Sequence, residues 1–210
     1  ADIITASAGT SNFRAGVNAG NTIESGGNYN VVVGDEAGTA ITTGDNNVAV
    51  GYAALDATTT ANGNIAVGSN SLGVNITGAS NVGVGHEALA ANTSGGENVA
   101  LGYGALDANT TASSNTGLGY LALSANITGT NNVGVGAASL DANTTGDNNT
   151  GLGTNALSAN TTAEANVAVG VNALLANTTG AYNVAIGAFA GDSFTTSSGN
   201  VAIGYQALST

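Results

Sequence analysis

The chain has no cysteine, methionine, proline or tryptophan, and Arg14 is its only Lys or Arg against 13 carboxylates. The formal net charge is therefore −12. A nucleic-acid-binding surface needs several Lys and Arg side chains to neutralise phosphates, so no nucleic-acid partner is expected. The same shortage disfavours anionic membrane surfaces, and no apolar run is long enough to cross a bilayer, so we expect no membrane insertion. Without cysteine, the sequence does not reveal the redox compartment.

Large side chains and charges are also scarce. Aromatic residues make up 4% and charged residues 7% of the 210 residues, whereas about 25% of an average globular domain is charged. The 42% hydrophobic content is mostly Ala and Val. This composition cannot fill one large core, so we predict that the protein is not an enzyme. Disorder is disfavoured as well, because Pro and Lys are missing and β-branched residues are frequent.

The sequence is an internal repeat with a period of 17 residues, typified by NVAVGYAALDATTTANG at residues 47–63. We call each set of residues 17 apart a column and name it after its member in this unit. A unit with so few large apolar side chains cannot bury a core alone and must stack on its neighbours. We therefore predict an all-β parallel β-solenoid of about eleven to twelve coils over residues 30–210. Residues 1–29 form a degenerate coil and a candidate connector between subunits.

Period-two alternation in the repeat predicts a short strand in each coil. The Val48 and Val50 columns hold mainly Val, Ile and Leu and are expected to point inward, with the Ala49 column between them pointing outward. A second apolar column, that of Leu55, predicts a second strand in each coil, and the invariant Gly51 column predicts a tight turn.

The Asn47 column is expected to be structural. Stacked Asn side chains in register hydrogen-bond to their copies in neighbouring strands and form an amide ladder. The predicted ladder contains Asn47, Asn64, Asn81, Asn98, Asn115, Asn132, Asn149, Asn166, Asn183 and Asn200.

The Ala49 column is expected to be an interface between chains. From Ala49 onward it alternates only between Ala and Gly, whereas a solvent-exposed column would drift to polar and charged residues. A second copy of the chain packed against it is the simplest explanation. The predicted interface contains Ala49, Ala66, Gly83, Ala100, Gly117, Gly134, Gly151, Ala168, Ala185 and Ala202.

The strand sequences NVAVG (residues 47–51) and NVAIG (residues 183–187), followed by xxAL, resemble the head repeats of trimeric autotransporter adhesins. With the NTTG corners they are still more similar to NTTGxxNVAVGxxAL repeats of phage tail fibres and related bacterial surface proteins. The resemblance covers residues 30–210 and implies a left-handed β-roll, usually a homotrimer. No coiled-coil stalk, membrane anchor or chaperone domain of those groups is visible in the sequence.

Several motifs resemble catalytic or binding sites but are interpreted as parts of the repeat or as surface residues. Gly83, Gly85 and Ala88 match a dinucleotide-binding fingerprint, but the match recurs in other units, whereas a Rossmann fold uses one such turn. His86, the only histidine, is interpreted as a solvent-facing variable residue, and a transition-metal site would lack ligands. The carboxylates scatter over variable columns, so we expect no cofactor, and incidental Ca²⁺ binding is left open.

Three other features leave alternatives open. The Thr60 column could form an ice-binding array, although its Thr pairs are adjacent rather than at i and i+2. Tyr52, Tyr103, Tyr120 and Tyr205 share a column that could contact glycans, although isolated surface residues are favoured. N-x-[ST] glycosylation sequences also occur in the corners, where we favour Asn and Thr as corner residues. They start at Asn75, Asn92, Asn109, Asn126, Asn143, Asn160 and Asn177.

These observations predict a non-enzymatic structural fibre or filament protein of an extracellular, cell or virion surface, which assembles with copies of itself. The alternatives are an adhesin or receptor-binding segment, with a cell-surface or glycan receptor, and an ice-binding solenoid. The last unit ends at GYQALST, where other units enter their corner, and the first begins with ADIITASAGTS. Joined, the two read as one continuous unit, which suggests head-to-tail stacking of subunits into a filament.

Overall fold

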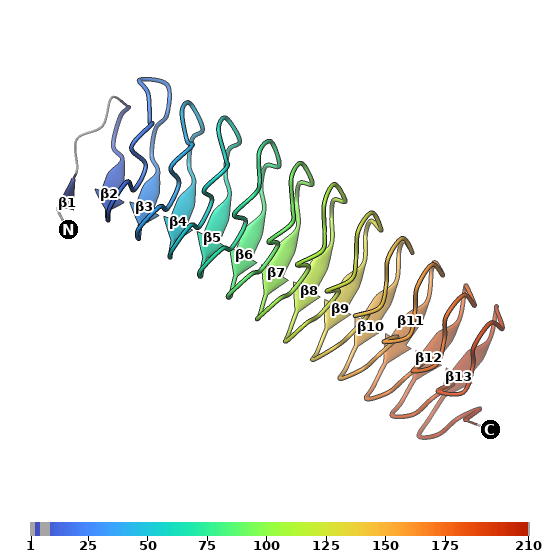
Figure 1. The fold of residues 1–210 in the computed structure, drawn as a ribbon. Helices are drawn as coiled ribbons and strands as arrows, with labels where there is room; N and C mark the ends of the chain where they lie inside the picture. The colour runs from blue at the N-terminus through green and yellow to red at the C-terminus, as the bar shows by residue number, and fades with distance from the viewer. Residues whose placement is uncertain (1–2, 5–8, 210) are drawn as a thin grey trace.

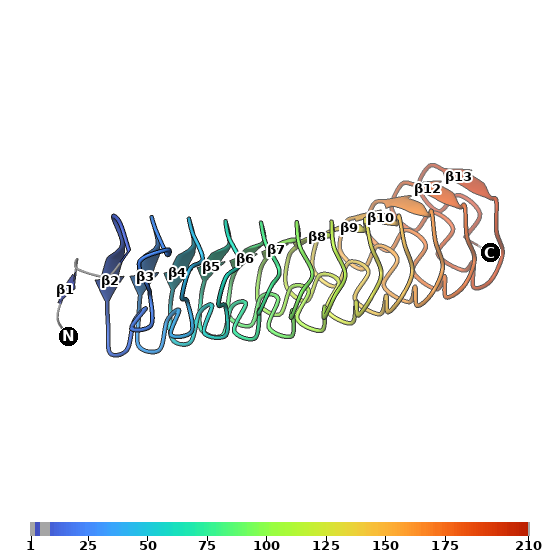
Figure 2. The same cartoon turned by 90° about the horizontal axis from the view of Figure 1, so that it is seen from above.

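The computed structural model describes residues 3–4 and 9–209. They form a parallel β-solenoid in which each 17-residue unit is one coil, as predicted, with about eleven turns in all. The coils stack into an elongated rod, with the first and last labelled strands at its opposite ends (Figures 1 and 2). The strands are β1 (Ile3–Ile4), β2 (Phe13–Ala15), β3 (Val31–Val33), β4 (Val48–Val50), β5 (Ile65–Val67), β6 (Val82–Val84), β7 (Val99–Leu101), β8 (Thr116–Leu118), β9 (Val133–Val135), β10 (Thr150–Leu152), β11 (Val167–Val169), β12 (Val184–Ile186) and β13 (Val201–Ile203).

These strands form one 13-stranded sheet in sequence order. Strands β2 to β13 pair in parallel and in register, so that Val48 lies beside Ile65 and Ala49 beside Ala66. Strand β1 instead pairs antiparallel with β2, with Ile4 opposite Arg14. No helix that could cross a membrane occurs in the described part of the chain.

Each strand ends at the glycine of the Gly51 column. Gly51 has φ +137°, and a Cβ there would lie 2.6 Å from the carbonyl oxygen of Gly68 in the next coil. A side chain is therefore excluded by both the backbone conformation and the neighbouring coil.

The prediction of a second strand in each coil is wrong. The Leu55 column lies in a turn segment, and its leucines have positive φ, for example +51° at Leu55 and +54° at Leu106. Their backbone N–H groups still donate across coils, as from Leu55 to the carbonyl of Ser71 at 3.1 Å. The sequence showed an apolar column here, but apolar periodicity does not distinguish a strand from a turn that repeats with the same period.

Candidate functional site

The Ala49 column lies inside the coil, so the prediction that it faces outward to a partner chain is wrong. Ala49, Ala100 and Ala168 are fully buried within the single chain. The opposite wall is the Leu55 column, and a Cβ added at Gly117 would lie 3.3 Å from Leu106 Cγ. A coil of 17 residues is too thin to hold two large side chains face to face, which restricts this column to Ala and Gly from Ala49 onward. Val32 fits in the same column because Gly38 replaces the leucine opposite it. The correction applies to Ala49, Ala66, Gly83, Ala100, Gly117, Gly134, Gly151, Ala168, Ala185 and Ala202.

The Val48 and Val50 columns point outward instead, because side chains alternate across a strand. They form what we call the outer face, which Thr116 and Thr150 alone interrupt with a polar group. Leu101 exposes 48% of its surface and Ile186 exposes 40%. The outer face contains Val31, Val48, Ile65, Val82, Val99, Thr116, Val133, Thr150, Val167, Val184 and Val201, with Val33, Val50, Val67, Val84, Leu101, Leu118, Val135, Leu152, Val169, Ile186 and Ile203. It carries no charged residue in a chain of net charge −12.

The Asn47 column is buried, and its side chains hydrogen-bond from coil to coil. The backbone N–H of Asn47 donates to Asn30 Oδ1 at 2.9 Å, and Asn47 Nδ2 donates to the same oxygen at 3.2 Å. Asn47 Nδ2 also donates to the carbonyl of Ala61 at 2.9 Å, across the corner of its own coil. The same backbone-to-side-chain bond is made by Asn64, Asn81, Asn98, Asn115, Asn132, Asn149, Asn166, Asn183 and Asn200.

A second amide ladder was not predicted. The seven asparagines of the corner sequons, Asn75 to Asn177, are fully buried and stack on one another. Asn92 Nδ2 donates to Asn75 Oδ1 at 2.9 Å and to the carbonyl of Gly95 at 2.9 Å. We call Asn75, Asn92, Asn109, Asn126, Asn143, Asn160 and Asn177 the second ladder. Their uniform spacing of 17 was visible in the sequence, but NTTG reads equally well as turn chemistry.

The paired threonines of the corners have different surroundings. Thr144 and Thr161, in the Thr59 column, are partly buried, and Thr144 Oγ1 donates to the carbonyl of Thr161 at 3.0 Å. Thr145 and Thr162, in the Thr60 column, are exposed. The hydroxyls of the two columns therefore do not lie together on one flat strand.

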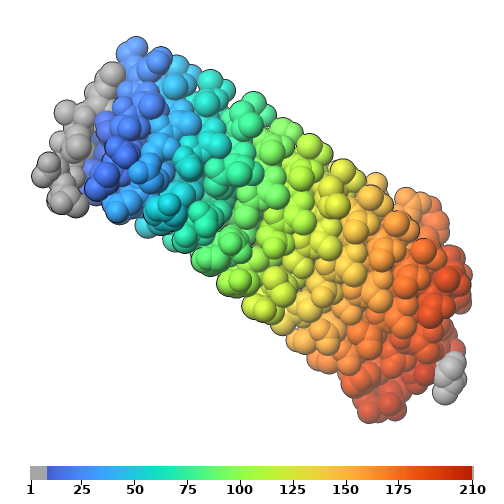
Figure 3. Space-filling model, viewed as in Figure 1, coloured from blue at the N-terminus to red at the C-terminus, as the bar shows by residue number. Residues whose placement is uncertain are grey.

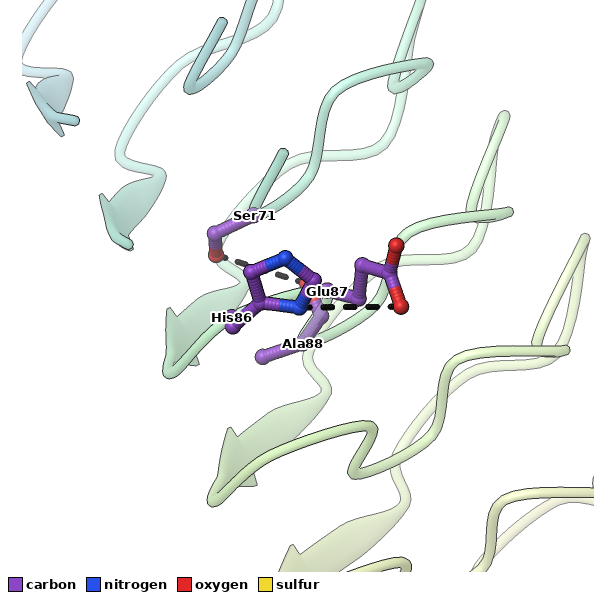
Figure 4. A network of polar contacts seen from close by, with 4 residues as sticks. All are labelled: Ser71, His86, Glu87 and Ala88. Atoms are coloured by element: carbon purple, nitrogen blue, oxygen red, sulfur yellow. Dashed lines mark hydrogen bonds and ion pairs between the residues drawn. The ribbon is translucent and has the colours of Figure 1, made fainter. Parts of the chain in front are cut away.

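His86 lies on the surface at the end of an aromatic stack. Its ring stacks on Tyr103 with 5.3 Å between centroids, and Tyr103 stacks on Tyr120 at 5.6 Å. His86 Nδ1 lies 3.6 Å from Glu87 Oε2, and nearby Ser71 Oγ donates to the carbonyl of Ala88 at 3.4 Å (Figure 4). Ser71 Oγ also donates to the carbonyl of Gly83 at 2.9 Å. Tyr103 and Tyr120 still expose about half of their surface, so the stack is a surface feature.

The carboxylates are dispersed along the rod. Burial raises the pKa of Asp107 and of Asp141, against the hydrogen bonds that each accepts from backbone N–H groups. The described residues include no group of three or more His, Asp or Glu side chains that could hold a metal ion. The described surface also has no pocket, and the space-filling view shows a continuous surface (Figure 3).

No protein-family model, curated protein or solved structure is significantly similar to the chain. The outer face is an apolar feature of the described surface that extends from coil to coil without a charge.

Proposed function

We propose that this chain is the rod segment of a non-enzymatic structural fibre or filament on an extracellular, cell or virion surface. In this role, copies associate side by side through their outer faces, as a homotrimer like those of the repeats it resembles. The observation that carries the proposal is the outer face itself, which is apolar and free of charge along the rod.

The size of the outer face fits a stable association. Eleven coils at about 4.8 Å give a length of about 50 Å, and two outward columns give a width of about 10 Å. Each face therefore has an area of about 500 Å², and the three faces of a trimer would bury about 1,500 Å² in total, which is within the range of specific interfaces. Contiguous apolar patches of this size on soluble proteins usually mark interaction sites.

A second copy of the chain fits this surface better than an unrelated partner. Only a surface with the same coil spacing can match the rows of side chains in register along the whole rod. Within the described residues, the acidic side chains all lie on the other faces, where they would repel each other between copies. Association through the uncharged face keeps these charges apart.

Side-by-side association also agrees with the pairing at the N-terminal end. Strand β1 pairs with β2 of its own chain, whereas head-to-tail stacking would require the first residues to complete the last coil of another subunit. The same residues cannot do both at once.

The location outside a cell also agrees with the scarcity of basic residues. The chain has no Lys and a single Arg, Arg14, so trypsin has one cleavage site, which suits protease-rich surroundings.

The test places charges on the outer face. The double variant Leu101→Glu and Val135→Glu should remain folded, because both side chains point outward, but should be monomeric by light scattering and sedimentation. The control, Thr111→Glu with Thr145→Glu, adds the same charge at exposed corners and should keep the mass of the wild-type oligomer. A wild-type chain that is monomeric at 100 µM, or an outer-face variant with an unchanged mass, would contradict the proposal.

An ice-binding solenoid is the alternative that the exposed Thr60 column favours. It predicts thermal hysteresis that Thr111→Glu with Thr145→Glu reduces and that Leu101→Glu with Val135→Glu leaves unchanged.

A further inference from the structure

The chain contains an eighth N-x-[ST] sequence, which lies outside the second ladder. It is Asn148-Asn149-Thr150, and it begins at the corner residue two positions before the start of the strand β10. Asn148 is exposed, and its backbone N–H donates to the carbonyl of Thr130 at 3.0 Å. Its side chain makes no hydrogen bond to any described residue. The eight sequons therefore differ in the environment of the acceptor nitrogen.

N-glycosylation changes the hydrogen-bonding capacity of that nitrogen. Asn Nδ2 forms a bond to C1 of a lipid-pyrophosphate-linked oligosaccharide, the bond from C1 to the pyrophosphate oxygen breaks, and the lipid pyrophosphate leaves with the electron pair. Nδ2 gives up one proton to a base of the transferase in this step, so the product amide keeps a single N–H. An asparagine that uses both of its N–H groups in the fold cannot be glycosylated without losing a hydrogen bond.

Second-ladder asparagines use both N–H groups and have no free space around them. Asn126 Nδ2 donates to Asn109 Oδ1 at 3.1 Å and to the carbonyl of Gly129 at 2.9 Å. Asn160 Nδ2 donates in the same way to Asn143 Oδ1 at 2.9 Å and to the carbonyl of Ala163 at 3.2 Å. Even a methyl group added at Gly78 would come within 3.0 Å of Asn92 Nδ2. A glycan on this ladder would separate the coils.

We propose that Asn148 is the one N-glycan acceptor of the folded rod, and that glycosylation of any second-ladder asparagine prevents folding. N-glycosylation and folding therefore compete for the same seven side chains. A chain that is glycosylated on the second ladder before it folds cannot fold afterwards. The folded rod therefore forms only if folding precedes glycosylation or if no glycosyltransferase is present.

The test translates the full chain, behind a cleavable signal sequence, into microsomes that carry an oligosaccharyltransferase. Protease treatment then separates folded rods from unfolded chains, and mass spectrometry maps the glycans. We expect the resistant fraction to carry a glycan at Asn148 alone and the sensitive fraction to carry glycans on second-ladder asparagines. A glycan on the second ladder of resistant chains, or no glycan at Asn148 in them, would overturn the proposal.

A matched variant removes the acceptor sequences and keeps the ladder. Its exposed sequon hydroxyls are replaced by Ala at Thr77, Ser94, Thr111, Thr128, Thr145, Thr162 and Thr179. We expect this variant to be recovered mostly as resistant chains with one glycan, and Thr150→Val in addition to remove that glycan. Val is the usual residue of this column, so the last change should leave the rod folded. If the share of protease-resistant chains were the same in the Ala variant as in wild type, glycosylation would not compete with folding and the proposal would be wrong.

Discussion

At the scale of single residues, buried asparagine amides hold neighbouring coils together, a role that apolar side chains have in most protein interiors. A buried amide is costly unless its donors and acceptors are paired. Asn109 Nδ2 donates to Asn92 Oδ1 at 2.9 Å and to the carbonyl of Ala112 at 3.0 Å, and Asn109 Oδ1 accepts from Asn126 Nδ2 at 3.1 Å. Each rung thereby connects three successive coils and stabilises their register.

Asn109→Ala should therefore be strongly destabilising. It leaves Asn92 Oδ1 and one N–H of Asn126 buried without a partner, at an expected cost of about 2–5 kcal/mol. Thr111→Ala, at an exposed position of the same coil, should change stability by less than about 0.5 kcal/mol. Urea unfolding followed by circular dichroism compares the two, and equal midpoints would argue against a stabilising ladder.

Backbone conformation provides a second prediction at this scale. Ala165 has φ +55°, at a column where some coils have Gly or Asn, such as Gly63 and Asn131, and others have Ser, Glu or Tyr. A non-glycine residue in this region costs about 1–2 kcal/mol, so Ala165→Gly should stabilise the rod by about 1 kcal/mol.

Ala168→Gly is the control for that experiment. Ala168 lies in the strand β11 and is fully buried, so the same change should lower stability by about 0.5–1 kcal/mol there. Shifts of the same sign for both variants would show that the conformation at Ala165 is not strained.

The stability of the fold should depend on pH through two half-buried carboxyl groups. Burial raises the pKa of Asp107 and Asp141, so each binds its proton more tightly in the folded chain than in the unfolded one. Such a group stabilises the fold below its ordinary pKa of about 4, and this contribution is lost as the pH rises through the folded pKa. We expect the urea midpoint to increase when the pH falls from 7 towards about 4.

Asp107→Asn with Asp141→Asn keeps an oxygen acceptor without the charge. This variant should have a higher urea midpoint than wild type at pH 7 and a smaller change on acidification. Glu24→Gln removes a charge at an exposed position and should retain the wild-type dependence. A wild-type midpoint that falls steadily on acidification would exclude this account.

At the scale of one coil, the interior volume is conserved by paired substitutions. Where Gly replaces Leu in the Leu55 column, an apolar residue replaces Asn three positions later, as in Gly38 with Ile41 and Gly191 with Phe194. A Cβ at Gly191 would lie 3.0 Å from the Phe194 ring, so the ring fills the space of the missing leucine. The exchange ends the second ladder, because Asn177 Oδ1 has no hydrogen-bond partner beside Phe194.

A double-mutant cycle tests this compensation. Gly191→Leu alone should destabilise by about 1–3 kcal/mol through overpacking, and Phe194→Asn alone should destabilise by about 3 kcal/mol through the lost ring. The double variant restores the usual Leu and Asn and provides a partner for Asn177, so its loss should be smaller than the sum by at least about 1 kcal/mol. Additive losses would show that the two positions do not compensate.

At the scale of the whole molecule, stability is shared among nearest neighbours, because each strand pairs only with the strands before and after it. The rod therefore has no central core, and its interior is one narrow column of Leu with Ala and Gly around it. The side chains left outside, among them Leu118 and Val135, supply the outer face on which the proposed association depends.

The period of the sequence was sufficient to predict the solenoid, the parallel pairing and the position of the one strand that each coil contains. A strict repeat of 17 residues leaves no other way to bury a short apolar unit than to stack it. It also predicted the location of the Asn47 column and the turn at Gly51. These features depend only on the 17-residue spacing of equivalent residues, which can be read directly from the sequence.

The direction in which each column points was decided only by the tertiary structure. Alternation predicts that Val48 and Ala49 lie on opposite sides of the strand, but it does not say which side is inside. The larger residue was expected inside, yet the Leu55 column lies so close to the strand that only Ala or Gly fits between them. The same close approach buries the sequon asparagines, because whether a corner amide meets water or the next coil depends on how tightly the coils stack.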